Sequence, residues 1–334
     1  MLTRRDFMGA GLGAAGAALV GGSLVPWVGF ADGFTPFAEP GKVVQVRHPS
    51  PLEGIGMKPA AAREMLAAGV KALTGARSAE DAWRRFVRPT DVVALKPNGL
   101  GGRFLATHKE LVEATIDALV GVGVPPTNIL VYEQYNPYMR ACRFEPGSTL
   151  PNGVRIKVHL GRDAGPEWTN VPSGRTKFVR PLLEATAVIN FPLAKDHAIC
   201  GVTGCLKNMT HGSIVNPADF HRRHASPMIA ELYAHEAIRT RVRLHVMDAT
   251  RVLCNNGPQD SPNFRRSSDA LWFSTDPVAI DSLLIGLIDS DRRARRLPTL
   301  AARGSPPSYV EAAAGLGLGI AEAARIRVQE IRVA

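Results

Sequence analysis

The chain has 334 residues, of which 45% are hydrophobic and 21% are charged. That length is enough for one large domain or two of average size, and the apolar content excludes an intrinsically disordered chain. The 32 glycines show no period and there are only four cysteines, which excludes collagen-like chains and disulfide scaffolds. The composition therefore predicts a globular protein whose function must be sought in local motifs.

The formal charge of +10 comes from 40 basic and 30 acidic residues, and 31 of the basic residues are arginine. A basic balance is compatible with a nucleic-acid or anionic-membrane partner. The basic residues are scattered, however, and no recognition-helix or RNA-binding motif accompanies them, so no nucleic-acid partner is expected. Because lysine is rare in this chain, a lysine in a polar loop is informative, since it supplies a compact amine whose pKa can be tuned.

The N-terminus carries a targeting signal. Residues 3–8 form a twin-arginine pattern, and residues 9–30 follow as a mildly apolar stretch rich in glycine and alanine. Small residues at its end suit cleavage, so we interpret residues 1–31 as a twin-arginine signal peptide and residues 32–41 as a spacer. An uncleaved membrane anchor is the alternative. The expected partner is the twin-arginine export machinery, the expected location is periplasmic or extracellular, and the membrane would be met only during export or through an uncleaved signal.

Export by this route bears on cofactors and on disulfides. The twin-arginine pattern resembles signals that export proteins after folding, often with a cofactor already loaded. The compartment beyond the membrane is oxidising and permits disulfides. The cysteines are Cys142, Cys200, Cys205 and Cys254, and their spacing matches no zinc or iron–sulfur signature. Buried thiols or one disulfide are the simplest interpretation, and an iron–sulfur redox protein is retained as an alternative.

Hydrophobic periodicity predicts strands that alternate with helices along residues 42–333, which we take as one domain. Strands are expected over residues 43–47, 91–95, 128–132, 154–159, 187–191, 242–247, 271–274 and 326–333. Helices are expected over residues 58–73 with Gly75 as the stop, 109–120 with Thr107 as the cap, 276–287 capped by Asp276 or Thr275, and 308–316. An amphipathic stretch covers residues 179–185, and residues 140–173 have little periodicity.

This alternation predicts an α/β fold, in which a mainly parallel sheet has helices on both faces. Two α/β lobes with the site between them are the alternative arrangement. Polar side chains follow several of the predicted strands, namely Lys96, Asn98, Glu133, Lys195, His197, Asp248, Thr275 and Asp276. Ligands in open α/β sheets bind at the carboxyl ends of the strands, so we expect these side chains to converge on one edge of the sheet.

Residues 190–224 contain the densest group of chemically active side chains. Four of the nine histidines and two of the nine lysines lie in this segment, which has a loop-like composition. Lys195 and His197 are two residues apart, so an extended backbone would point both to the same side. For any single histidine here, including His221, a structural hydrogen bond is the plain alternative to a role in a site.

The run from Gly201 through Thr203 and Gly204 to Lys207 and Asn208 is interpreted as an anion-binding loop. Small residues there leave backbone amides free to wrap a phosphate or carboxylate, and a cation and an amide side chain follow. The run lacks the residue order of a Walker phosphate-binding loop. Ordinary turns are the alternative explanation for its glycines.

Residues 93–98 are a second candidate element, because Lys96 and Asn98 would reach a ligand from the end of a strand. A strand that ends in a surface turn is the alternative. His108 opens the following helix, where the helix dipole favours a neutral imidazole that can act as a base.

These motifs resemble, in order, those of the domain of unknown function 362 family. The matching segments are residues 93–98, Lys195 with His197, residues 201–208, Gly212, and residues 276–281. The likeness extends from about residue 43 to residue 333. It implies an α/β fold in an exported protein without the ferredoxin module that some relatives carry, and it implies no established reaction.

The segment from His197 to Lys207 is also similar, more distantly, to the lactate racemase family, which holds a nickel-pincer nucleotide. That family attaches its cofactor to a lysine and ligates the metal with a histidine. The similarity implies Lys195 and His197 for these roles, with His108 and His221 as proton-transfer groups. The Ser-Gly-Gly that precedes the family's lysine is replaced here by residues 203–205, Thr-Gly-Cys.

Together these features predict an exported, cofactor- or metal-dependent enzyme that transfers a proton or hydride on a small anionic substrate, as racemases, isomerases and oxidoreductases do. Its cofactor would be a transition metal, nickel or iron, or a nucleotide-derived group. The candidates are His108, Lys195 and His197 for catalysis, Lys96, Asn98, Gly201, Thr203, Gly204, Lys207 and Asn208 for cofactor or anion binding, and His197 and His221 for metal. A non-catalytic periplasmic anion-binding or carrier protein is the alternative.

Overall fold

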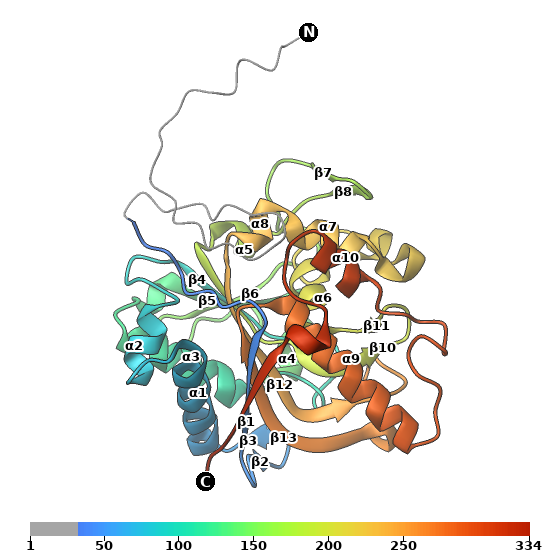
Figure 1. Cartoon of the computed structure of the whole chain (residues 1–334). Helices are drawn as coiled ribbons and strands as arrows, with labels where there is room; N and C mark the ends of the chain where they lie inside the picture. Colours follow the sequence, from blue (N-terminus) through green and yellow to red (C-terminus); the bar gives the residue numbers. More distant parts are fainter. Residues whose placement is uncertain (1–32) are drawn as a thin grey trace.

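The computed structural model describes residues 33–334, and Figure 1 shows a central sheet with helices on either side of it. The signal peptide predicted over residues 1–31 lies outside the described residues. Within the described part of the chain, no helix is both long and apolar enough to cross a bilayer. Part of the predicted spacer contacts the domain, since Phe37 packs edge-on against Phe86 and the Gly41 amide donates to Asp276.

The main sheet has ten strands in the order β14-β1-β13-β12-β9-β4-β5-β6, with β10 beside β12 and β11 beside β10. The strands are β1 (Lys42–Arg47), β4 (Val93–Lys96), β5 (Ile129–Glu133), β6 (Arg155–Val158), β9 (Ala187–Asn190), β10 (Leu193–His197), β11 (Gly201–Val202), β12 (Val242–Leu253), β13 (Arg265–Ser274) and β14 (Arg327–Arg332). Two hairpins stand apart from it, β2 (Leu52–Glu53) with β3 (Gly56–Met57) and β7 (Thr169–Val171) with β8 (Gly174–Thr176). Most neighbouring strands are parallel, as predicted, and the sheet is continuous from β14 to β6 instead of being divided into two lobes.

Helices cover both faces of this sheet, which confirms the predicted α/β fold. The first face carries α1 (Pro59–Thr74), α2 (Ala79–Arg84), α3 (Lys109–Gly121) and α4 (Asn136–Ala141). The second face carries α5 (Arg180–Glu184), α6 (Gly204–His211), α7 (Met228–Ala234), α8 (Glu236–Arg239), α9 (Pro277–Ala294) and α10 (Tyr309–Gly315). Alternate residues of β4 join different cores, Val93 and Leu95 on the first face and Ala94 on the second. A strand buried on both faces reads as an unbroken apolar run, as the sequence of β4 does.

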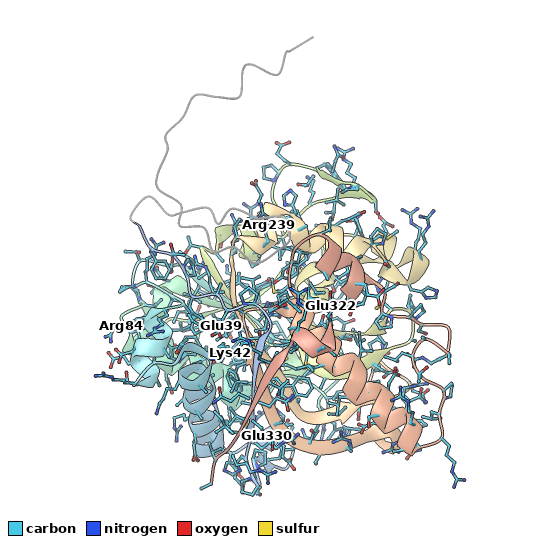
Figure 2. All side chains as sticks on the ribbon, viewed as in Figure 1. Glu39, Lys42, Arg84, Arg239, Glu322 and Glu330 are labelled. Atoms are coloured by element: carbon cyan, nitrogen blue, oxygen red, sulfur yellow. The ribbon has the colours of Figure 1, made fainter. Side chains whose placement is uncertain are left out.

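Local sequence signals predicted several boundaries of the helices and strands correctly. Helix α1 ends at Gly75, whose φ of 68° is a left-handed conformation that glycine adopts at little cost. The Asp276 carboxylate accepts the Ala279 amide, so the predicted cap of α9 is confirmed. Charged side chains, Arg84, Arg239 and Glu330 among them, lie at separate places on the outside, as their scatter along the sequence suggests (Figure 2).

Three expectations about these elements are wrong. Thr107 does not cap α3, because its hydroxyl accepts the Asn98 amide and donates to the Phe191 carbonyl, which ties the loop after β4 to the end of β9. Strands β12 and β13 are longer than predicted. The residues that pair beyond the predicted bounds are partly polar, so no apolar run in the sequence marks them as strand. Because β13 runs antiparallel to β12, its end carries Thr275 and Asp276 to the opposite edge of the sheet, away from the other strand-end side chains.

Candidate functional site

The candidate site lies at the carboxyl edge of the sheet, between β4 and β9. The chain leaves β4 for α3 on the first face, whereas it leaves β9 through β10 for α6 on the second face. Ligands in open α/β sheets bind in the crevice that forms at such a switch point. A cavity of about 290 Å³ lies here. The predicted site residues in its lining are Lys96, Asn98, His197, Thr203, Lys207, Asn208 and His221.

Lys96 enters the cavity wall as half of a buried ion pair. Its Nζ lies 3.2 Å from Glu133 Oε2 and donates to the Pro97 carbonyl. Glu133 Oε1 also accepts the Gly99 amide, so the loop after β4 is held to the end of β5. Gly212 lies against this pair, because a Cβ there would stand 2.6 Å from Lys96 Cε. The charges of Lys96 and Glu133 therefore largely cancel, and neither is free for a ligand.

Lys195 lies directly behind the cavity wall. Its ammonium donates to Asn98 Oδ1 at 3.0 Å and to the Pro258 carbonyl at 3.1 Å. Burial, and next the charge of Lys207, lower the pKa of Lys195 to about 7. Asp196 points the other way, to Arg303, so Lys195 and His197 share one side of β10 as predicted.

A ladder of hydrogen bonds between buried side chains joins this wall to the core. Two of its four members, Asn190 and His245, were not predicted from the sequence. Asn98 Nδ2 donates to Asn208 Oδ1, and Asn208 Nδ2 donates to Asn190 Oδ1. Asn190 in turn donates to His245 Nδ1. The signal for Asn190 is its own position, a polar residue at the end of an otherwise apolar strand. Because every rung is satisfied, the ladder fixes α6 against β4 and β9.

His197 presents a neutral N–H donor to the cavity. Its Nδ1 accepts the amides of Ile199 and Cys200, so the ring proton is on Nε2. Burial, and next the charge of Lys207, lower its pKa to about 2. The ring therefore stays neutral at ordinary pH and donates through Nε2, which makes it a poor proton acceptor.

His221 has the opposite tautomer. Its Nδ1 donates to the Pro217 carbonyl at 2.9 Å, which leaves Nε2 as an unprotonated acceptor. Burial, and next the charge of Lys207, lower its pKa to about 4. The ring stacks on His197 with centroids 5.6 Å apart and meets His211 edge-on at 4.5 Å. His221 is the only one of these three rings whose bare nitrogen is not engaged by a described residue, because His211 bonds to Phe220 and to Thr210.

Lys207 is the unbalanced charge of the site. Its side chain is buried on α6, and among residues 33–334 no hydrogen bond or ion pair reaches its ammonium. Burial lowers its pKa, and its charge in turn lowers the pKa values of the surrounding histidines. Within the same part of the chain, the Thr203 hydroxyl and Gln134 Nε2 are also buried without a partner. A cation and two polar groups without partners in the described chain, all at one cavity, are suited to an anionic ligand.

Gly201 and Gly204, which were predicted to belong to an anion-binding loop, are not part of the cavity lining. Gly201 belongs to β11, and two amides of the first turn of α6, those of Cys205 and Leu206, donate to the Asp281 carboxylate. Gly204 has φ +56°, and a Cβ there would lie 2.2 Å from Asp281 Oδ1. Glycine is therefore required at position 204, because Asp281 approaches so closely. The Asp281 carboxylate lies where a bound anion was predicted.

Replacing Asp281 is expected to test this capping. Asp281→Ala leaves two buried amides of α6 without acceptors, and we expect a loss of about 3 kcal/mol in the free energy of unfolding. Chemical denaturation measures this loss. Asp117→Ala, at an exposed position of α3, is the control and should change stability by less than about 0.5 kcal/mol. Equal stability of the two variants would contradict the capping role.

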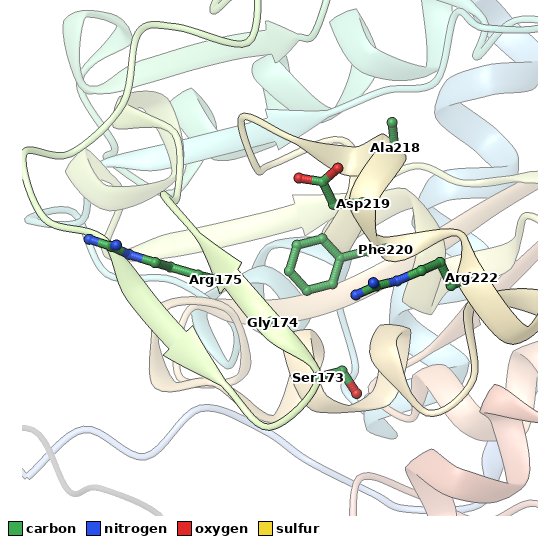
Figure 3. Close-up of a pocket in the computed structure, with 7 residues that line it drawn as sticks. All are labelled: Ser173, Gly174, Arg175, Ala218, Asp219, Phe220 and Arg222. Carbon is green, nitrogen blue, oxygen red and sulfur yellow. The ribbon is translucent and has the colours of Figure 1, made fainter.

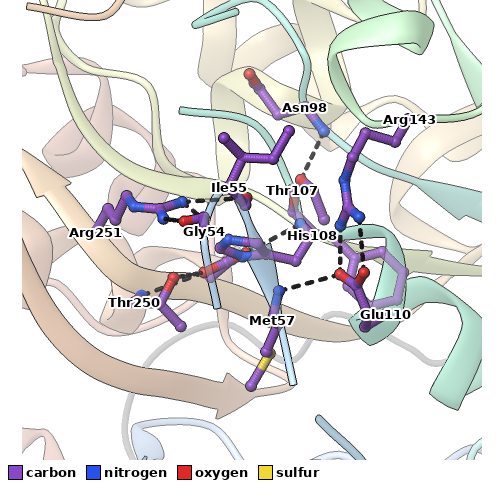
Figure 4. A network of polar contacts seen from close by, with 12 residues as sticks. Gly54, Ile55, Met57, Asn98, Thr107, His108, Glu110, Arg143, Thr250 and Arg251 are labelled. Carbon is purple, nitrogen blue, oxygen red and sulfur yellow. Dashed lines mark hydrogen bonds and ion pairs between the residues drawn. The ribbon is translucent and has the colours of Figure 1, made fainter. Parts of the chain in front are cut away.

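His108 belongs to a separate network, drawn in Figure 4. Its Nδ1 donates to Asp248 at 2.6 Å, and its Nε2 accepts from Arg251 at 3.1 Å. Arg251 also binds the carbonyls of Gly54 and Ile55, which fastens the β2–β3 hairpin to the sheet. Both ring nitrogens are engaged and His108 is outside the cavity lining, so His108 and Asp248 do not converge with the other candidates.

His197 and His221 do not fit a metal centre. A metal-ligating imidazole binds through a bare nitrogen and donates its other N–H, as His221 could and His197 could not. The Lys207 ammonium beside them also opposes a cation. No set of three or more histidine, cysteine or acidic side chains within residues 33–334 is placed to hold a metal ion. The four cysteines are free and buried, so neither a disulfide nor a ligand set for an iron–sulfur cluster is formed.

The fold is an α/β fold with a mainly parallel sheet, and its small cavity lies at the switch point, where ligands of open α/β sheets bind. The chain belongs to the family described as "Domain of unknown function (DUF362)", whose model matches residues 93–285, more than half of the chain. The matched segment includes every residue of the cavity, and it confirms the family resemblance found in the motifs. No curated protein matches the chain.

Proposed function

We propose that this protein is an exported enzyme that moves a proton on a small organic carboxylate. The observation that carries the proposal is the Lys207 ammonium, which lines the cavity and has no hydrogen-bond or ion-pair partner among residues 33–334. A carboxylate that binds there gains a charge-assisted hydrogen bond and removes the cost of the unpaired cation. The cavity volume of about 290 Å³ limits the bound part of the substrate to a small molecule.

The donors around Lys207 suit an anion whose charge grows during reaction. The Thr203 hydroxyl and the His197 Nε2–H are neutral donors that can complete the shell around a carboxylate. When a carbon next to that carboxylate loses a proton, negative charge moves onto the carboxylate oxygens. Donors held in place beforehand stabilise that charge without reorganisation.

His221 is the proposed base. Its Nδ1–H is fixed on the Pro217 carbonyl, its Nε2 is bare, and its pKa of about 4 keeps it unprotonated at neutral pH. After it accepts a proton, the nearby Lys207 charge favours release of that proton, so the group returns readily to its basic form. Lys195 acts through Asn98, whose amide oxygen it holds, and we assign it a positioning role.

Hydrogen exchange tests the reaction. We expect purified protein in D₂O to replace the proton next to the carboxylate in at least one acid from a panel of small 2-hydroxy and 2-amino carboxylates, followed by proton NMR. His221→Asn should slow this exchange by at least about 100-fold, because general-base catalysis contributes that much. His224→Asn, three residues away and exposed, is the matched control and should leave the rate unchanged.

The outcomes separate the candidate functions. Exchange that survives in His221→Asn would remove His221 as the base. Binding of a carboxylate without exchange of any of these acids would instead favour the non-catalytic carrier, which uses the same anion site without turnover.

A further inference from the structure

A second hollow, of about 460 Å³, opens beside the cavity, and Figure 3 shows its lining. One wall is formed by Ser173, Gly174 and Arg175 at the β7–β8 hairpin, and the other by the 3₁₀ helix η2 (Pro217–Phe220) and Arg222. We call this hollow the hairpin groove. Ala218 lines both the cavity and the hairpin groove. His221 of the cavity directly precedes Arg222 of the groove, so the two spaces are contiguous.

The groove offers an aromatic floor and a cation at its edge. The Phe220 ring lies under Gly174, where a Cβ would stand 3.4 Å from the ring, and Figure 3 shows the Arg222 side chain beside that ring. Arg222 is exposed, and no hydrogen bond or ion pair within the described chain reaches its guanidinium. The neighbouring Asp219 is engaged by the Asn216 amide instead. A free guanidinium next to an aromatic face is suited to a carboxylate or phosphate group.

The backbone after Arg222 is held in an unusual conformation. Arg223, His224 and Ala225 have φ values of 51°, 58° and 61°, which side-chain-bearing residues rarely adopt. Three consecutive left-handed residues cost of order 1–3 kcal/mol each, and such strain persists mainly where the surroundings enforce it, often at binding sites. The turn holds Arg222 at the groove while it carries the next arginine away from the groove lining.

We infer that the hairpin groove is a second anion subsite, and that the substrate is an elongated molecule with an acidic group at each end. This inference rests on the proposed function, because the first acidic group is the carboxylate at Lys207. The second group, a carboxylate or a phosphate, reaches Arg222 by way of Ala218. The Asp219 carboxylate also lines the groove, but the Asn216 amide engages it, whereas the Arg222 guanidinium lies beside the Phe220 ring. The Arg175 guanidinium lies over the Trp168 ring instead.

Calorimetric titration with matched probes tests the subsite. The probes are straight-chain monocarboxylates and the dicarboxylates of equal length, from butyrate with succinate to heptanoate with pimelate, and ω-phosphonocarboxylates form a parallel arm. In the unmodified protein we expect one diacid to bind about 10-fold more tightly than its monoacid, which corresponds to one charge-assisted contact. The arm with the larger preference identifies the second group as carboxylate or phosphate.

Two neighbouring arginines give a matched pair of variants. Arg222→Gln should remove the preference for the diacid and leave the monoacid affinity within about twofold. Arg223→Gln removes the same charge one residue away, outside the groove lining, and should keep the preference. Equal preference in both variants, or no preference in the unmodified protein, would overturn the second subsite. If instead monoacid binding is absent or insensitive to Lys207→Met, the proposed function itself fails, and the subsite fails with it.

Discussion

Lys207→Met is expected to stabilise the fold by about 2 kcal/mol while weakening carboxylate binding at least about 100-fold. Methionine keeps most of the length of this largely buried side chain and removes the ammonium, which lines the cavity without a partner among residues 33–334. The same ammonium is the proposed contact for the substrate carboxylate. A gain in stability together with a loss of binding is typical of a functional group that the fold tolerates at a cost.

Urea denaturation and calorimetric titration with the monocarboxylate probes measure the two effects on one preparation. Lys157→Met is the control, because Lys157 is exposed on β6 and its replacement should change neither quantity by much. A less stable Lys207→Met protein would mean that the ammonium has a favourable partner in the fold. Unchanged binding would move the anion site elsewhere.

The fold and half of the site could be predicted because both depend on signals that lie close together in the sequence. Strands β4, β5 and β9 are apolar runs, and the polar residue that ends each one marks the carboxyl edge of a parallel sheet. Lys96, Asn98 and His197 meet there for that reason. The shared orientation of Lys195 and His197 could be predicted for the same reason, because side chains two residues apart in a strand point to the same side.

Other features depend on partners far away in the chain, so no local pattern reports them. Helix α6 looked like a loop because it is buried on every side and carries Lys207, Asn208 and His211 in place of an apolar stripe. Its N-terminal acceptor is Asp281, more than seventy residues later. The different tautomers of His197 and His221 are set by backbone groups at each ring, and they decide which ring donates and which accepts.

The free energy of unfolding is expected to fall steeply as the pH drops from about 6.5 to about 4, because the fold holds several imidazoles neutral. In the unfolded chain an imidazole titrates near pH 6.5. Burial lowers the pKa of His159 to about 4 and that of His245 to about 3, and it acts in the same direction on His197, His211 and His221. Below pH 6.5 the unfolded chain therefore binds protons that the folded chain excludes, so stability is present above that pH and is lost as the pH falls.

The expected loss is large enough to unfold the protein. One pKa unit corresponds to about 1.4 kcal/mol, so His159, His197 and His245 together give a loss on the order of 10 kcal/mol at pH 4, comparable with the whole stability of a typical domain. Asp281 works in the opposite direction, because burial raises its pKa to about 7 and the folded state then takes up a proton. A single carboxyl offsets only part of the effect of five imidazoles.

Tryptophan fluorescence during urea unfolding at a series of pH values measures how the free energy of unfolding changes with pH. One histidine variant tests whether a buried ring causes that change. His159→Asn keeps an acceptor for the Gly161 amide and removes one titrating ring, so the loss of stability on acidification should decrease by the share of one proton. His48→Asn is the matched control, because His48 accepts the Ser50 amide in the same local pattern but lies where solvent reaches the ring. A protein whose stability is flat between pH 6.5 and pH 4, or a slope that both variants change equally, would show that the buried rings are not held neutral by the fold.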